Sequence, residues 1–170
     1  MAHGSCAKLI LILNTAVLFS CSNLHTPKTT AIETAEISKE VNQAYNSISS
    51  YSQKAQLDSF LSYYANTPGF VMISSDGVMR NYEEFKNICT EYYKALQMQT
   101  VKTTKENLQI IDSNLVLVAW TGDIIATMKN GDIMKMTNYS ITSVFKKIDG
   151  KWKVIHDHES SLPPEIIKKW

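Results

Sequence analysis

Two imidazoles near the C-terminus are the side chains best suited to acid–base chemistry. His156 and His158 are followed by Ser160 in a segment with the alternating pattern of a β-strand. Imidazole titrates near neutral pH, and residues two apart on a strand share a face. One face should therefore carry Trp152, Val154, His156, His158 and Ser160. Because Asp157 and Glu159 lie on the other face, we expect that face to meet solvent and the histidine face to line a cavity.

Three functions fit two histidines and a hydroxyl at the mouth of an apolar cavity. The side chains could hydrogen-bond a small ligand, or His156 or His158 could act as a general acid or base. A His-x-His pair could also bind a metal ion, but no third ligand appears at a matching spacing. A structural role, in which both histidines bond to the backbone and to Ser160, is the remaining interpretation. We favour ligand binding and predict no metal and no cofactor.

Three further side chains are predicted to line the ligand cavity. They are Tyr64 at the end of a helical stripe, Trp120 in mid-strand and Asn138 on the following strand. An aromatic side chain on an apolar stripe is also a normal core residue. Cys89 lies in the apolar stripe of a helix, which predicts a buried and unreactive thiol.

The pattern along the chain predicts helices first and strands afterwards. Apolar residues recur at helical spacing over residues 32–48 and 57–64, and Asn81 with Glu84 forms a capping pair that opens a third helix. Strand-like segments then cover residues 101–111, 115–128, 133–147 and 152–160. The dipeptides Asn130-Gly131 and Asp149-Gly150 favour two-residue hairpins. We therefore expect an α+β fold with a long, coiled antiparallel meander whose concave face is filled by helices.

This order of elements resembles the cone-shaped fold of nuclear transport factor 2, ketosteroid isomerase and SnoaL-like cyclases. Residues 145–160, with the sequence FKKIDGKWKVIHDHES, resemble the closing hairpin of SnoaL-like domains and of the calcium/calmodulin-dependent kinase II association domain. The resemblance covers residues 31–162 and implies a curved antiparallel sheet wrapped around N-terminal helices. Members with acid–base chemistry commonly have an aspartate where this chain has Asn66. The resemblance therefore implies the fold and a cavity, but no catalytic residue.

The N-terminus predicts export and lipid anchoring. Lys8 precedes an apolar run of eleven residues, too short for a membrane span, and Leu18-Phe19-Ser20-Cys21 resembles a bacterial lipobox. We expect a lipoprotein-type signal peptide at residues 1–20, lipidation of Cys21, a flexible tether at 21–30 and the SnoaL-like domain at 31–170. The chain would then be a secreted, membrane-anchored bacterial lipoprotein of the periplasm or cell surface.

Composition limits the partners. Basic and acidic residues nearly balance, 17 against 16, and Arg80 is the only arginine, which argues against nucleic-acid binding. We predict a small-molecule ligand, a homodimer, and membrane contact through the lipid anchor alone. The preferred function is binding of a small, largely apolar molecule in the cone cavity. The alternatives are an isomerase, cyclase or dehydratase that uses His156 or His158, and a non-catalytic dimeric interaction module with a filled cavity.

Overall fold

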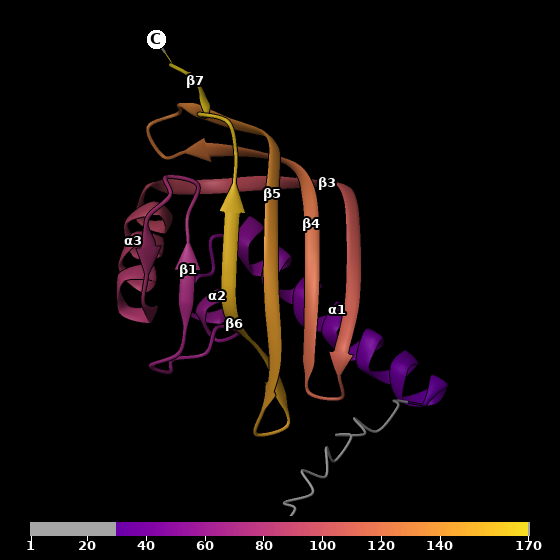
Figure 1. Cartoon of the computed structure of the whole chain (residues 1–170). Coiled ribbons are helices and arrows are strands. Elements are labelled where there is room, and N and C mark those ends of the chain that lie inside the picture. The colour runs from indigo at the N-terminus through magenta and orange to yellow at the C-terminus, as the bar shows by residue number, and fades with distance from the viewer. Residues whose placement is uncertain (1–29, 170) are drawn as a thin grey trace, which may run out of the picture.

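Helices come first and strands follow in the computed structural model, which describes residues 30–169 (Figure 1). The helices are α1 (Ala31–Gln53), α2 (Leu57–Leu61) and α3 (Tyr82–Ala95). The strands are β1 (Val71–Ile73), β2 (Met79–Arg80), β3 (Leu96–Asp112), β4 (Leu115–Met128), β5 (Ile133–Ile148), β6 (Lys151–Ser160) and β7 (Glu165–Ile167). The predicted signal peptide, Cys21 and all but the last residue of the predicted tether lie outside the described residues.

The strands form one curved sheet in the order β2-β1-β6-β5-β4-β3, with β7 paired to β5 (Figure 1). The four long strands, β3 to β6, are an antiparallel meander, as predicted. The short strand β1 adds to β6 in parallel, so the complete sheet is mixed. The predicted α+β cone, a curved sheet around N-terminal helices, is confirmed.

Local sequence explains where the elements begin and turn. At the start of α3 the Glu84 N–H donates to Asn81 Oδ1 at 3.0 Å, and the Asn81 N–H donates to Glu84 Oε2 at 2.9 Å. This reciprocal capping box is the one the sequence predicts. Asp149 and Gly150 both have positive φ, 48° and 74°, as a tight hairpin between β5 and β6 requires.

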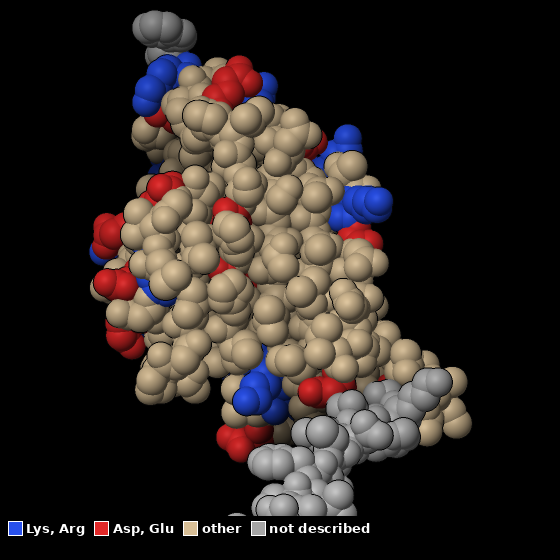
Figure 2. Space-filling view, viewed as in Figure 1, with Lys and Arg blue, Asp and Glu red and all other residues tan. Residues whose placement is uncertain are grey.

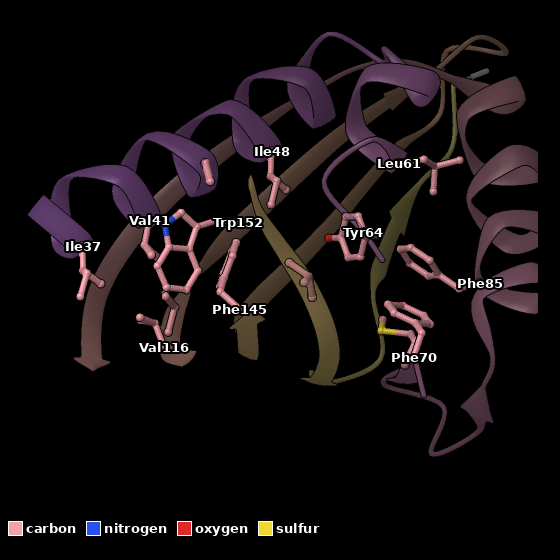
Figure 3. Packing of buried hydrophobic residues seen from close by; sticks show 14 residues of the cluster. Ile37, Val41, Ile48, Leu61, Tyr64, Phe70, Phe85, Val116, Phe145 and Trp152 are labelled. Carbon is pink, nitrogen blue, oxygen red and sulfur yellow. The ribbon is translucent and has the colours of Figure 1, made fainter. Parts of the chain in front are cut away.

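The core lies between α1 and the concave face of the sheet. Val41 and Ile48 of α1 cover Phe145 and Trp152 of β5 and β6 (Figure 3). A second group, at the end of the sheet near α3, consists of the aromatic rings of Phe60, Tyr64, Phe70 and Phe85. None of the helices within residues 30–169 has an apolar stretch long enough to cross a bilayer.

The outer face of the sheet is poor in charge. In Figure 2, which shows this face with α1 behind it, most Lys, Arg, Asp and Glu side chains lie around the margins. The C-terminal β7 runs along β5, with Ile167 opposite Ile133, and Lys168 pairs with Asp132 at 2.8 Å. β7 and Lys168 therefore hold the C-terminal segment against the β4–β5 hairpin.

The pairing of β4 with β5 is irregular next to Gly122. Here Gly122 pairs with Tyr139 and Ile124 pairs with Met136, so β5 has one residue more than β4. A Cβ at position 122 would overlap the carbonyl oxygen of Lys102 and the indole of Trp120. Glycine is therefore required by the close approach of β3, not by its own φ.

We expect Gly122→Ala to lower the free energy of unfolding by about 1–3 kcal/mol, because backbone and indole must both shift. Urea denaturation followed by tryptophan fluorescence measures this change. Gly69→Ala is the matched control: a Cβ there meets no atom within 4 Å, so stability should stay within about 0.5 kcal/mol. Equal denaturation midpoints for the two variants would contradict the packing argument.

Candidate functional site

A β-bulge in β6 decides which side chains enter the cavity. Val154 pairs with Phe145 and His156 pairs with Val144, so Ile155 has no partner on β5. One extra residue shifts the alternation of faces by one position. Beyond Ile155 the concave face therefore continues through Asp157 and Glu159.

The prediction that one face runs unbroken from Trp152 to Ser160 is consequently wrong. Trp152 and Val154 are buried against α1 as expected, but His158 and Ser160 are exposed and His156 is only half-buried. His156 and His158 lie opposite Val144 and Thr142 on the outer face. Neither imidazole lines the cavity, and the Ser160 hydroxyl does not line it either.

Asn138 is also kept out of the cavity, by the bulge between β4 and β5 opposite Gly122 and Ile124. It is the exposed bulge residue of β5, with φ 53°, and its N–H donates to Asp123 Oδ1 at 3.1 Å. Asparagine tolerates this left-handed conformation better than most residues do. Its role in the fold is to turn β5 and not to contact a cavity ligand.

The cavity itself has a volume of about 370 Å³ and lies between α1, α3 and the concave face of the sheet. This volume is at the small end of the range of about 300–1,000 Å³ typical of ligand sites. Tyr64 and Trp120 both line it, and Tyr45, Phe60, Phe85, Tyr92, Tyr93 and Tyr139 supply further rings. The structure thus brings two of the six predicted ligand-binding residues to one cavity.

Asp157 is the most unusual side chain of the lining. Only 3% of it is exposed, and among residues 30–169 its Oδ1 has no hydrogen-bond partner. Burial raises the pKa of this carboxyl to about 8, and the nearby charge of Glu159 adds to the increase. The hydroxyls of Ser143 and Tyr64 act in the opposite direction but are outweighed.

Glu159 lies two residues further along the same face of β6. Burial raises its pKa to about 7, and the Tyr139 hydroxyl, which favours the ionised form, opposes the rise. Both carboxyls therefore exchange protons near neutral pH. Strict alternation along β6 predicts that both acids face solvent, which is wrong because nothing in the sequence marks Ile155 as unpaired.

The remaining polar groups of the lining divide into paired and unpaired ones. Gln99 accepts a hydrogen bond from the Tyr92 hydroxyl at 2.6 Å and donates one to the Ser52 hydroxyl. The amide oxygen and nitrogen of Gln99 therefore both have partners. Ser74 Oγ, in contrast, is buried without a partner in the described part of the chain. Burial raises the pKa of the Cys89 thiol to about 12, which agrees with the predicted unreactive thiol.

Residues 30–169 contain no group of three or more His, Cys, Asp and Glu side chains arranged to hold an ion. The site offers a largely apolar space with two proton-exchanging carboxyls on one wall. That arrangement can take a proton from a bound molecule and return it.

The free energy of unfolding should fall as the pH rises from about 4 to about 8. The folded chain keeps protons on Asp157 and Glu159 that the unfolded chain, with ordinary carboxyl pKa values, releases. Asp157→Asn should make this fall markedly smaller, as measured by urea denaturation across the pH range. Asp58→Asn, which removes an exposed carboxyl of α2, is the control and should keep the original pH dependence. A free energy of unfolding that stays constant from pH 4 to 8 in the wild-type protein would disprove the burial of the two carboxyls.

Comparisons with known proteins agree with this architecture. The profile of the SnoaL-like domain matches residues 41–164, whereas no curated protein matches the chain. A candidate scytalone dehydratase from Novosphingobium aromaticivorans superposes with a TM-score of 0.69 at 7% identity, covering 83% of this chain and 94% of that one. For a nuclear transport factor 2-like superfamily protein from Salmonella enterica the TM-score is 0.66 at 19% identity, covering 76% and 94%.

A hexachlorocyclohexane dehydrochlorinase gives a TM-score of 0.67 at 9% identity and covers 82% of this chain and 94% of its own. Identities this low establish the shared fold alone. The match of the domain profile, which spans most of the chain, establishes more and confirms the resemblance seen in the sequence. This chain belongs to the family of SnoaL-like domains.

Proposed function

We propose that this chain is an acid–base enzyme of the isomerase or dehydratase type, acting on a small, largely apolar molecule held in the cone cavity. The observation that carries the proposal is the carboxyl of Asp157, which is buried in an apolar cavity and has one oxygen without a hydrogen-bond partner among residues 30–169. A general base works best when its pKa lies near the working pH, and burial brings Asp157 to that range.

The chemistry needs one group that accepts a proton and one that donates it. The ionised Asp157 would take a proton from a carbon of the bound molecule, and the electron pair left behind would form a new double bond. In an isomerisation the proton returns to a different carbon; in a dehydration a second acid protonates the departing hydroxyl. When the two carboxyls share one proton, Glu159 carries it in those molecules in which Asp157 is ionised, and in that state Glu159 can act as the acid.

The structural neighbours support this reaction class. One is named a dehydrochlorinase and another a candidate dehydratase, and both names describe elimination reactions. Catalysis by a histidine and a non-catalytic interaction module with a filled cavity are less well supported. Catalysis by His156 or His158 does not fit side chains on the outer face, and a vestigial cavity does not fit an open volume of about 370 Å³.

A generic carbon acid tests the proposal without knowledge of the natural substrate. Nitrobenzisoxazole is neutral, fits a small apolar cavity, and opens with a colour change when one carbon-bound proton is removed. We expect the chain to catalyse this opening, with kcat/KM rising to a plateau above about pH 8, as Asp157 ionises. Asp157→Asn should lower kcat/KM at least about 100-fold.

His158→Ala is the matched control, because it removes an imidazole from the next position of the same strand but on the outer face. It should leave kcat/KM unchanged. If Asp157→Asn retains the full rate, or if His158→Ala abolishes it, the assignment of Asp157 as the base is overturned.

We also propose that the enzyme is exported and anchored through a lipid on Cys21. In a bacterial host, the full chain should appear in the membrane fraction and incorporate a fatty-acid label. Cys21→Ser should lose the label, whereas Cys6→Ser, within the predicted signal peptide, should keep it. Label retained by Cys21→Ser would refute the anchor.

A further inference from the structure

The cavity is lined by acidic side chains but, within residues 30–169, by no basic side chain. Its lining includes Asp157 and Glu159 but, among the described residues, no lysine, arginine or histidine. Neither carboxyl forms an ion pair within residues 30–169. The guanidinium of Arg80 lies outside the lining and is engaged with Asp76 at 2.6 Å. The charge of Arg80 lowers the pKa of Glu159, but Asp157 has no positively charged partner within residues 30–169. A bound molecule is therefore the natural source of positive charge beside Asp157.

Two polar atoms without a hydrogen-bond partner in the described part of the chain indicate where that charge would lie. Asp157 Oδ1 and Ser74 Oγ are both buried and both belong to the lining. The parallel register of β1 and β6 pairs Met72 with Asp157 and Ile73 with His158, so Ser74 follows at the Glu159 end of the row. A group with several hydrogen-bond donors could reach this row, and an ammonium ion has three donors and no acceptor.

The rest of the lining suits the body of such a ligand. The rings of Tyr45, Tyr64, Phe85 and Trp120 also line the cavity. Aromatic faces attract cations and also pack against apolar ligand surface. A carboxylate or phosphate ligand would find no lysine, arginine or histidine to pair with in the lining within residues 30–169, so an anionic ligand is disfavoured.

We propose that the molecule bound in this cavity is a small hydrophobic amine, held as its ammonium ion by Asp157 and Glu159 with its apolar body among the aromatic rings. The proposal rests on the proposed function only in taking this cavity as the substrate site. It adds a consequence: the ammonium ion keeps a carboxyl ionised at neutral pH, so the base is formed when the substrate arrives.

Three naphthalene compounds of similar size test the proposal by calorimetry on the full chain at pH 7. We expect naphthylethylamine to bind at least about tenfold more tightly than naphthylethanol, and naphthylacetate to bind most weakly. In buffers of different ionisation enthalpy, binding of the amine should release about one proton and binding of the alcohol none. Equal affinity for the amine and the alcohol, or preference for the acetate, would overturn the proposal.

Variants separate charge recognition from cavity shape. Asp157→Asn should weaken binding of the amine at least about tenfold while binding of the alcohol changes less than about twofold. His158→Ala should alter neither. An equal loss for all three compounds in Asp157→Asn would mean that the residue shapes the cavity, which contradicts the proposal.

The result for the amine is independent of the result for nitrobenzisoxazole. Loss of proton transfer in Asp157→Asn without any preference for the amine would refute the amine and leave the acid–base function. A preference for the amine, together with proton transfer that stays intact in Asp157→Asn, would refute Asp157 as the base and leave the amine proposal.

Discussion

One unpaired residue, Ile155, determines the chemistry of the cavity. A regular strand would carry the face of Trp152 and Val154 onward to the imidazoles and leave both acids in solvent. The bulge instead turns Asp157 and Glu159 inward at the point where β6 leaves α1 and enters the space beside α3. The same irregularity thus bends the sheet around the helices and exchanges two histidines for two carboxyls.

Placing a carboxyl there is energetically unfavourable. Moving the pKa of Asp157 from 3.8 to about 8 corresponds to a penalty on the order of 5 kcal/mol when the group is forced to ionise. That is comparable with the whole stability of a small domain, about 5–15 kcal/mol. The apolar core under α1 and the aromatic group near α3 must offset it. Strained or unsatisfied groups retained at such expense concentrate at functional sites.

Much of the fold follows from local sequence. The capping box at Asn81 and the Asp149-Gly150 hairpin depend on neighbouring residues, so both can be predicted from the chain alone. Tyr64 and Trp120 lie on apolar patterns that any concave face would bury. The parallel addition of β1 and the bulges at Ile155 and Asn138 depend instead on how strands far apart in sequence fit together in a curved sheet. Strict alternation of side chains along a strand therefore fails beyond the first bulge. For this reason it places Asp157 and Glu159 on the wrong face of β6.

The ionisation of Asp157 tests the whole account most directly. Carbon NMR of the side-chain carboxyls, with Asp157→Asn used to assign the resonance, follows that ionisation without any substrate. The account predicts a midpoint near pH 8 for Asp157, lowered in Glu159→Gln because the neighbouring charge is gone. A midpoint near pH 4 would place this carboxyl in water and contradict the inward turn of β6.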